Sequence, residues 1–161
     1  MPMSSPVRAR LRDWGPVALE QLLTVVWLGS LWTVGYLVAP VLFATLPERA
    51  LAGQVAGRLF TLVAWLGLGC GAALLALALW RWRRAQASLT LVLLPALMLL
   101  LVLTGEFGLQ PRMAELKALG ESGGAMFARL HGIAALLYLA ESLLGLGWLV
   151  LRVRETLRRA A

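Results

Sequence analysis

Charged residues are scarce in this chain of 161 residues: only 14% are Asp, Glu, Lys or Arg, whereas 60% are apolar. A soluble domain carries roughly a quarter charged residues, so the composition disfavours a water-soluble globule. The chain has one cysteine and one histidine, so it forms no intrachain disulfide and no cysteine-rich metal site. The motifs HExxH, GxxxxGK[ST] and GxGxxG are also missing, which disfavours an enzyme without excluding one that carries a cofactor.

Basic residues outnumber acidic ones, and the formal net charge is +7 at pH 7. Such a charge can indicate nucleic-acid binding, but here the basic residues flank long apolar runs, as they do in membrane proteins. Four segments, about 17–46, 59–80, 89–107 and 130–151, are long and apolar enough to cross about 30 Å of hydrocarbon. The sequence therefore predicts an all-α membrane protein, a four-transmembrane-helix bundle that contacts the lipid bilayer and not nucleic acid.

The predicted organisation is a basic arm (1–16), a single transmembrane domain (17–151) and a basic tail (152–161). Ten Lys and Arg residues fall in the arm, in the connection between the second and third spans and in the tail, whereas five fall in the other two connections. Basic residues in short loops mark the cytoplasmic side, so both termini are predicted to be cytoplasmic. The first span is too long for a straight crossing, and we expect it to tilt or to begin near Pro16.

Glu141 is the most unusual residue within a predicted span. It lies eleven residues after Leu130, about 16 Å into the membrane and close to its centre. A charge at this depth costs at least ~2.5 kcal/mol, so the side chain needs a partner or a bound proton. Ser30, at a similar depth in the first span, is a candidate donor. Glu141 is thus either a protonated group that joins helices or a proton or cation site.

A second group of polar residues is expected at the external interface, where Glu106 ends the third span and His131 opens the fourth. A histidine beside a carboxylate can titrate near neutrality or ligate a metal, but an ordinary ionic cluster that includes Arg112 would look the same. His131, Met113 and Met126 are the soft ligands available there for Cu(I). A haem in a four-helix bundle needs axial ligands for its iron, and the chain supplies a single histidine. No cofactor is predicted, and copper and haem remain alternatives.

Small residues recur in the second span, where Gly67 and Gly71 lie four residues apart in GLGCG. Glycines at this spacing let the backbones of two membrane helices approach closely. We therefore assign Gly67 and Gly71 to helix packing, and we expect the same face to support a homo-oligomer.

The run from Trp27 to Phe60, followed by PRMAELKAL and MFARLHG, resembles the transmembrane protein 205-like family, whose bacterial members form domain of unknown function 4149. The matching positions are Gly29, Gly35, Ala39, Pro40, Phe43, Ala52, Gly53, Gly57, Phe60, Pro111, Leu116, Lys117, Leu130, His131 and Gly132. The resemblance implies a multi-pass protein of the bacterial inner membrane without an assigned activity. It also implies an external rim formed by Pro40, Arg49, Gly53, Arg112 and His131. A looser likeness to copper-resistance membrane proteins keeps metal handling open.

Two functions are consistent with these observations. The first is a small integral inner-membrane protein that binds or passes a small solute or metal ion at the external end of its bundle. Because four spans make a thin bundle, this function calls for a homo-oligomer. The alternative is a non-catalytic membrane scaffold or assembly subunit that docks to another membrane protein.

Overall fold

The computed structural model describes residues 5–160 of the chain, and the side chains of residues 5–14, 156, 159 and 160 lie outside this description. The basic side chains predicted at Arg8, Arg10, Arg12 and Arg159 therefore lie outside it as well. The described residues form helices and connections and contain no strand. Four stretches are long and apolar enough to cross a membrane: Gly15–Thr45, Arg49–Arg83, Thr90–Ala118 and Ala125–Glu155. The predicted all-α protein with four membrane spans is confirmed.

Two of the four spans are built from three helical pieces each, and two are single long helices. The elements are α1 (Ser5–Trp32), the π-helix η1 (Thr33–Val38), α2 (Ala39–Thr45), α3 (Arg49–Arg83), α4 (Thr90–Leu103), the π-helix η2 (Thr104–Leu109), α5 (Gln110–Ala118) and α6 (Ala125–Ala160). The first span begins at Gly15, next to Pro16, and α1 continues through this proline. The helices also run beyond the apolar segments of the sequence, since their polar ends continue the same backbone hydrogen bonding outside the hydrocarbon.

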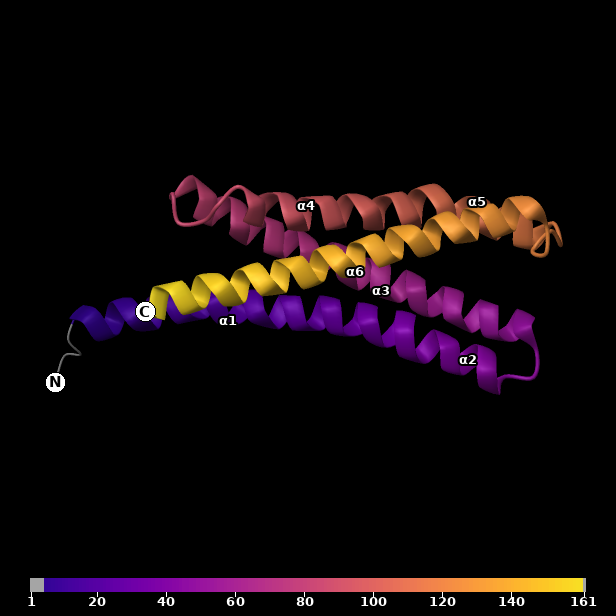
Figure 1. Cartoon of the computed structure of the whole chain (residues 1–161), viewed down its shortest axis with the longest axis horizontal. Helices are drawn as coiled ribbons and strands as arrows, with labels where there is room; N and C mark the ends of the chain where they lie inside the picture. The colour runs from indigo at the N-terminus through magenta and orange to yellow at the C-terminus, as the bar shows by residue number, and fades with distance from the viewer. Residues whose placement is uncertain (1–4, 161) are drawn as a thin grey trace.

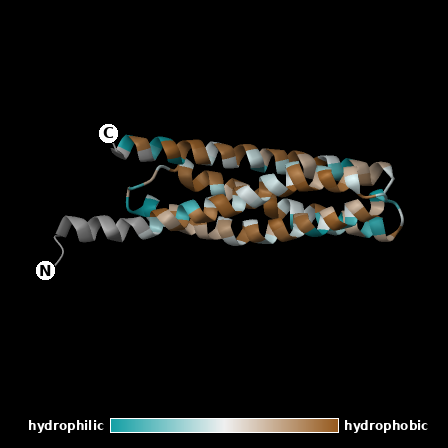
Figure 2. Ribbon diagram, turned by 90° about the horizontal axis from the view of Figure 1, so that it is seen from below, coloured by the Kyte–Doolittle hydropathy of each residue, from teal (hydrophilic) through white to brown (hydrophobic). Residues whose placement is uncertain are grey.

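The start of α1 and the end of α6 lie at the same end of the bundle as the connection 84–89, and we call this the terminal end (Figure 1). The connections 46–48 and 119–124 lie at the opposite, distal end. Hydrophilic residues gather towards the two ends and apolar residues dominate between them, as a membrane crossing requires (Figure 2). Each of α3 and α4 packs closely against two neighbours, α3 against α1 and α4, and α4 against α3 and α6. The contact between α1 and α6 is sparser.

Each π-helix lies just before a proline. The N–H of Ala39 donates to the carbonyl of Val34, and the N–H of Gln110 donates to that of Gly105, so both bonds span five residues instead of four. Pro40 and Pro111 come next; proline has no N–H, and its ring would collide with the carbonyl four residues earlier. A wider π turn relieves this collision without breaking the helix.

The two π segments belong to an internal repeat of the chain. Thr33, Tyr36 and Pro40 correspond to Thr104, Phe107 and Pro111, because every pair is separated by the same number of residues. The same offset relates Trp27 of α1 to Met98 of α4. Both are buried, and each lies close to a glycine of the long helix that follows it: Trp27 to Gly67 of α3, and Met98 to Gly145 of α6. The bundle therefore consists of two similar helical hairpins.

Candidate functional site

Most of the buried polar side chains of the described residues lie between α1 and α6. From the terminal to the distal end, the polar side chains that meet here are Glu20, Thr24, Trp27 and Tyr36 on α1 and η1, and Arg152, Trp148, Ser142, Glu141 and Tyr138 on α6. We call this set the α1–α6 seam. The helices are far enough apart here that long polar side chains, and not close backbones, connect them.

Glu141 is held in the middle of the seam by the indole of Trp27. The Nε1–H of Trp27 donates to Oε1 of Glu141 at 3.1 Å, and the two residues are only 1% and 5% exposed. Ser30, the donor expected from the sequence, instead donates to the carbonyl of Trp27 at 2.8 Å. The expectation for Ser30 is wrong, because its short side chain bonds to the preceding turn of its own helix.

Two glycines of α3 make room for the indole of Trp27. A Cβ atom at Gly67 would lie 2.6 Å from Nε1 of Trp27, and one at Gly71 would lie 2.7 Å from Cη2 of the same ring. Both glycines are buried, so they pack helices of one chain together. The predicted use of this face for an oligomer contact is wrong because Trp27 covers it. A homo-oligomer itself stays a prediction.

Tyr138 closes the seam on the distal side of Glu141. Its hydroxyl donates to the carbonyl of Leu31, two residues before the π segment η1. Its ring lies against Gly35, where a Cβ atom would come within 2.9 Å of the phenol oxygen. The edge of the ring also meets Phe60 of α3, with ring centroids 5.2 Å apart. Gly35 thus lets a large aromatic ring lie directly on the π segment.

Tyr36 connects this region to the bundle surface. Its hydroxyl donates to Oγ of Ser142 at 2.9 Å, and its ring lies edge-on to that of Tyr138. Tyr36 is 52% exposed, whereas Ser142 is 6% exposed and is the chain neighbour of Glu141. The hydrogen bond from this exposed ring therefore ends at the residue next to Glu141 in the chain.

The terminal end of the seam is a buried ionic group. Glu20 accepts from both Arg81 of α3 and Arg152 of α6. Thr24 donates to the carbonyl of Glu20 at 2.8 Å and accepts from Nε1 of Trp148 at 3.2 Å. This group joins α1, α3 and α6, and it separates Glu141 from the terminal end of the bundle.

The rim residues predicted from the resemblance are spread around the distal half of the bundle. Pro40, Arg49, Arg112 and His131 are exposed, and Gly53 and Glu106 are partly exposed. Gly53 lies near the ring of Phe43, since a Cβ atom there would be 3.8 Å away. The roles predicted for these residues stay predictions.

His131 belongs to a small aromatic stack. Its ring is parallel to that of Phe127, with centroids 6.1 Å apart, and Nζ of Lys117 lies 5.6 Å from the centre of the Phe127 ring. Met113 is buried and Met126 is 56% exposed. Within the described residues, no three or more His, Cys, Asp and Glu side chains gather into a group that could hold a metal ion.

The residues 120–124 read GESGG and match the GxSxG pattern of α/β-hydrolases. In those enzymes the serine stands on a tight turn between a strand and a helix. Here Ser122 is exposed in the connection between α5 and α6, after Gly120 has ended α5 with a φ of 77°. The match therefore lacks the structural context of a nucleophile.

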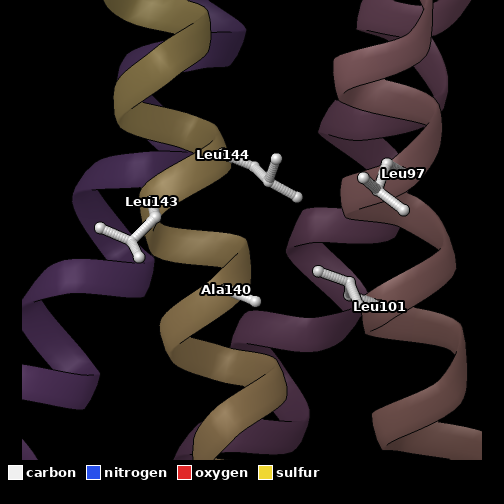
Figure 3. A pocket seen from close by; sticks show the side chains of 5 residues that line it. All are labelled: Leu97, Leu101, Ala140, Leu143 and Leu144. Atoms are coloured by element: carbon white, nitrogen blue, oxygen red, sulfur yellow. The ribbon is translucent and has the colours of Figure 1, made fainter.

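An open recess of about 420 Å³ lies between α4 and α6 (Figure 3). Its lining is entirely apolar, formed by Leu97, Leu101, Ala140, Leu143 and Leu144. Such a surface offers no hydrogen bond and suits hydrocarbon. The buried polar side chains of the described residues, Glu20, Thr24, Arg81, Glu141 and Ser142, do not line this recess.

The family model of a domain of unknown function (DUF4149) matches residues 22–122, which is more than half of the chain. The chain belongs to this family. No curated protein and no solved structure matches it. The DUF4149 match covers Trp27, Pro40 and both glycines under the indole, and it ends before His131 and Glu141. The DUF4149 assignment and the four spans together describe a multi-pass membrane protein of unknown activity.

Proposed function

We propose that this DUF4149 protein binds a small ion at Glu141 and passes it along the α1–α6 seam. The observation that carries the proposal is a carboxylate that is 5% exposed in the middle of a membrane span. Ionisable groups at this depth are costly and mark ion pathways and proton relays in membrane proteins. The hydrogen bond from the half-exposed Tyr36 to Ser142, the chain neighbour of Glu141, supports a connection between the site and the bundle surface.

The remaining parts of the proposal come from the sequence. We place the protein in a bacterial inner membrane with both termini in the cytoplasm, because the terminal end carries most of the basic residues. The distal rim, with His131, Glu106 and Arg112, is then the external entrance, where a solute or metal ion would first be met. A homo-oligomer would enlarge this thin bundle.

An ion-flux assay on purified protein in liposomes tests the proposal. The panel contains protons, Na⁺, K⁺ and Cu⁺, each supplied as a gradient and followed by an ion-specific dye or tracer. At least one of these ions should cross faster than in protein-free liposomes. The flux should fall to the protein-free level in Glu141→Gln, because the amide keeps the size of the side chain but cannot carry the charge or the proton.

Glu115→Gln is the matched control, since Glu115 is an exposed carboxylate on α5 outside the seam. It should insert and conduct like the natural protein. Fluxes that equal those of protein-free liposomes for all ions in the panel contradict the proposal. Equal flux in the natural protein and in Glu141→Gln contradicts it as well.

A scaffold or assembly subunit is the second candidate, and one observation favours it. Every buried side-chain nitrogen and oxygen of the described residues has a hydrogen-bond partner, as a purely structural seam would require. Crosslinking in native membranes separates the two functions. A reproducible crosslink to a different membrane protein favours the scaffold, whereas crosslinks between copies of this chain favour the ion-binding oligomer.

A further inference from the structure

We infer that the ion taken up by Glu141 is a proton, bound by the carboxylate itself and not by a shell of ligands. This inference rests on the proposed function and names the substrate of the same site. It is carried by the contacts of Glu141 and by the chemistry of the elements around it. In apolar surroundings the charge of this carboxylate has to be neutralised by a proton or by a cation, and the two make different demands on a site.

The contact with Trp27 disfavours a metal or alkali cation. The indole N–H points at Oε1 of Glu141, and its hydrogen carries a partial positive charge that would face a bound cation. The ring cannot swing away easily, because Gly67 and Gly71 of α3 lie directly against it. A proton on Oε2 leaves this hydrogen bond intact and needs no movement of the indole.

The ligands that a cation needs are not gathered at Glu141. Hard cations such as Ca²⁺ take six to eight oxygen ligands, and Cu(I) prefers cysteine and methionine sulfur. In the part of the chain that the structure describes, no cluster of three acidic, histidine or cysteine side chains occurs. The recess between α4 and α6 is lined by aliphatic side chains and supplies no ligand. A proton needs a single lone pair and no cavity.

The other titratable groups around Glu141 are engaged elsewhere and do not neutralise its charge in place of a proton. Tyr138 on α6 donates to the carbonyl of Leu31, and Tyr36 on η1 donates to Ser142. Cys70 is the titratable residue in the middle of α3, and α4 has none over Thr90–Leu103. On the terminal side of Glu141, Arg152 of α6 and Arg81 of α3 are both engaged with Glu20.

We assign the hydroxyl groups of Tyr36 and Ser142 to the route of the proton. Tyr36 is half exposed, its hydroxyl is bonded to Ser142, and Ser142 adjoins Glu141 in the chain. Hydroxyl groups can accept one proton and donate another, which a metal ion cannot exploit. The proton then approaches the carboxylate through Tyr36 and Ser142, and Tyr138 and the Glu20 group lie on either side of Glu141 along the seam.

Infrared spectroscopy combined with the flux assay tests this inference. The purified protein in liposomes should show the carbonyl band of a protonated carboxyl group, and this band should titrate with pH. The band should vanish in Glu141→Gln and persist in the matched control Glu115→Gln. Glu141→Asp keeps a carboxyl group on a shorter side chain, so it should shift the band. This variant tests the inference if Glu141→Gln fails to fold. In the flux panel, protons alone should depend on Glu141.

The outcomes distinguish the inference from the proposed function. Flux of Na⁺, K⁺ or Cu⁺ that depends on Glu141, without proton flux, overturns the inference and leaves the proposed function standing. A titrating band without flux of any ion supports proton binding and overturns passage. A band that is absent, or unchanged in both Glu141→Gln and Glu141→Asp, overturns the inference whatever the fluxes are.

Discussion

The α1–α6 seam and the interface between α3 and α4 contain equivalent pieces of the two hairpins, but their chemistry differs. In the seam, Tyr36 of η1 donates a hydrogen bond to Ser142 of α6. At the other interface, Phe107 of η2 meets Trp65 of α3 edge to face, with centroids 5.7 Å apart. At this position the two π segments differ by one hydroxyl group. The comparison indicates that equivalent positions of the two hairpins share a backbone conformation and differ in the polarity of their side chains.

The two interfaces also differ in how closely their helices approach each other. The backbones of α3 and α4 pack closely along their length, whereas α1 and α6 are joined mainly by side chains. A close apolar interface derives its stability from many small contacts. The seam depends on a few hydrogen bonds and one ionic group, so single substitutions should affect it more strongly. The following predictions test this difference, from the largest effect to the smallest.

Trp27→Ala should destabilise the protein most, by about 3–5 kcal/mol, because it empties the centre of the bundle and removes the partner of Glu141. Trp65→Ala is the matched change at the other interface. Trp65 is 57% exposed, so lipid replaces most of its contacts and the loss should be much smaller. Thermal unfolding in mild detergent measures both, and equal losses would contradict the comparison.

Glu20→Gln should destabilise by about 2–3 kcal/mol, because it leaves Arg81 and Arg152 buried without their carboxylate. Glu155→Gln is the control, since Glu155 also binds Arg152 but has a side chain that is 27% exposed. Its loss should stay below about 1 kcal/mol, as for surface ion pairs. Thermal unfolding in mild detergent measures both variants. If Glu155→Gln loses more stability than Glu20→Gln, Glu20 is not the central carboxylate of the ionic group.

Gly71→Ala should cost about 1–3 kcal/mol, because the added methyl group would overlap the ring of Trp27. Gly69→Ala, two residues away, has open space around its Cβ position and should be neutral or slightly stabilising. If the two variants unfold at the same temperature, the indole does not rest on this helix as described.

Tyr36→Phe should cost about 0.5–1.5 kcal/mol through the lost hydrogen bond to Ser142. It makes η1 resemble η2 at this position. The reciprocal change, Phe107→Tyr, adds a hydroxyl group to a ring that is 55% exposed and should change stability by less than about 0.5 kcal/mol. Proton flux should fall in Tyr36→Phe and remain in Phe107→Tyr; the reverse order would remove Tyr36 from the route.

The four spans could be predicted from the sequence because length and hydropathy alone determine whether a segment can cross the membrane. The unusual depth of Glu141 was also evident, since a charged residue stands out in an apolar run. The hydrogen-bond partner of Glu141 was not evident from the sequence, because hydrogen bonds between α1 and α6 depend on how the two helices face each other. Trp27 was overlooked for a further reason: tryptophan is usually an interfacial residue in membrane proteins, whereas this one is buried at the centre.

The glycines illustrate the same limit. The spacing of Gly67 and Gly71 correctly indicated close packing, but spacing alone does not tell which helix, or which chain, approaches. The π segments were equally hidden, although Pro40 and Pro111 were visible in the sequence. Whether a proline kinks a helix or widens one turn depends on the neighbouring helices that hold it straight.

The π segments also affect the helical register of the two spans that contain them. Each contains one residue more than regular α-helical pairing would use, so it acts as an insertion already accommodated. Removing a single residue such as Leu37 would let the turn close to regular α-helical pairing, and the rest of the span would keep its direction. The ring of Pro40 would then meet the carbonyl four residues earlier, which is the collision that the wide turn relieves. Single-residue deletions in this family should therefore be tolerated in the connections and excluded from these two turns.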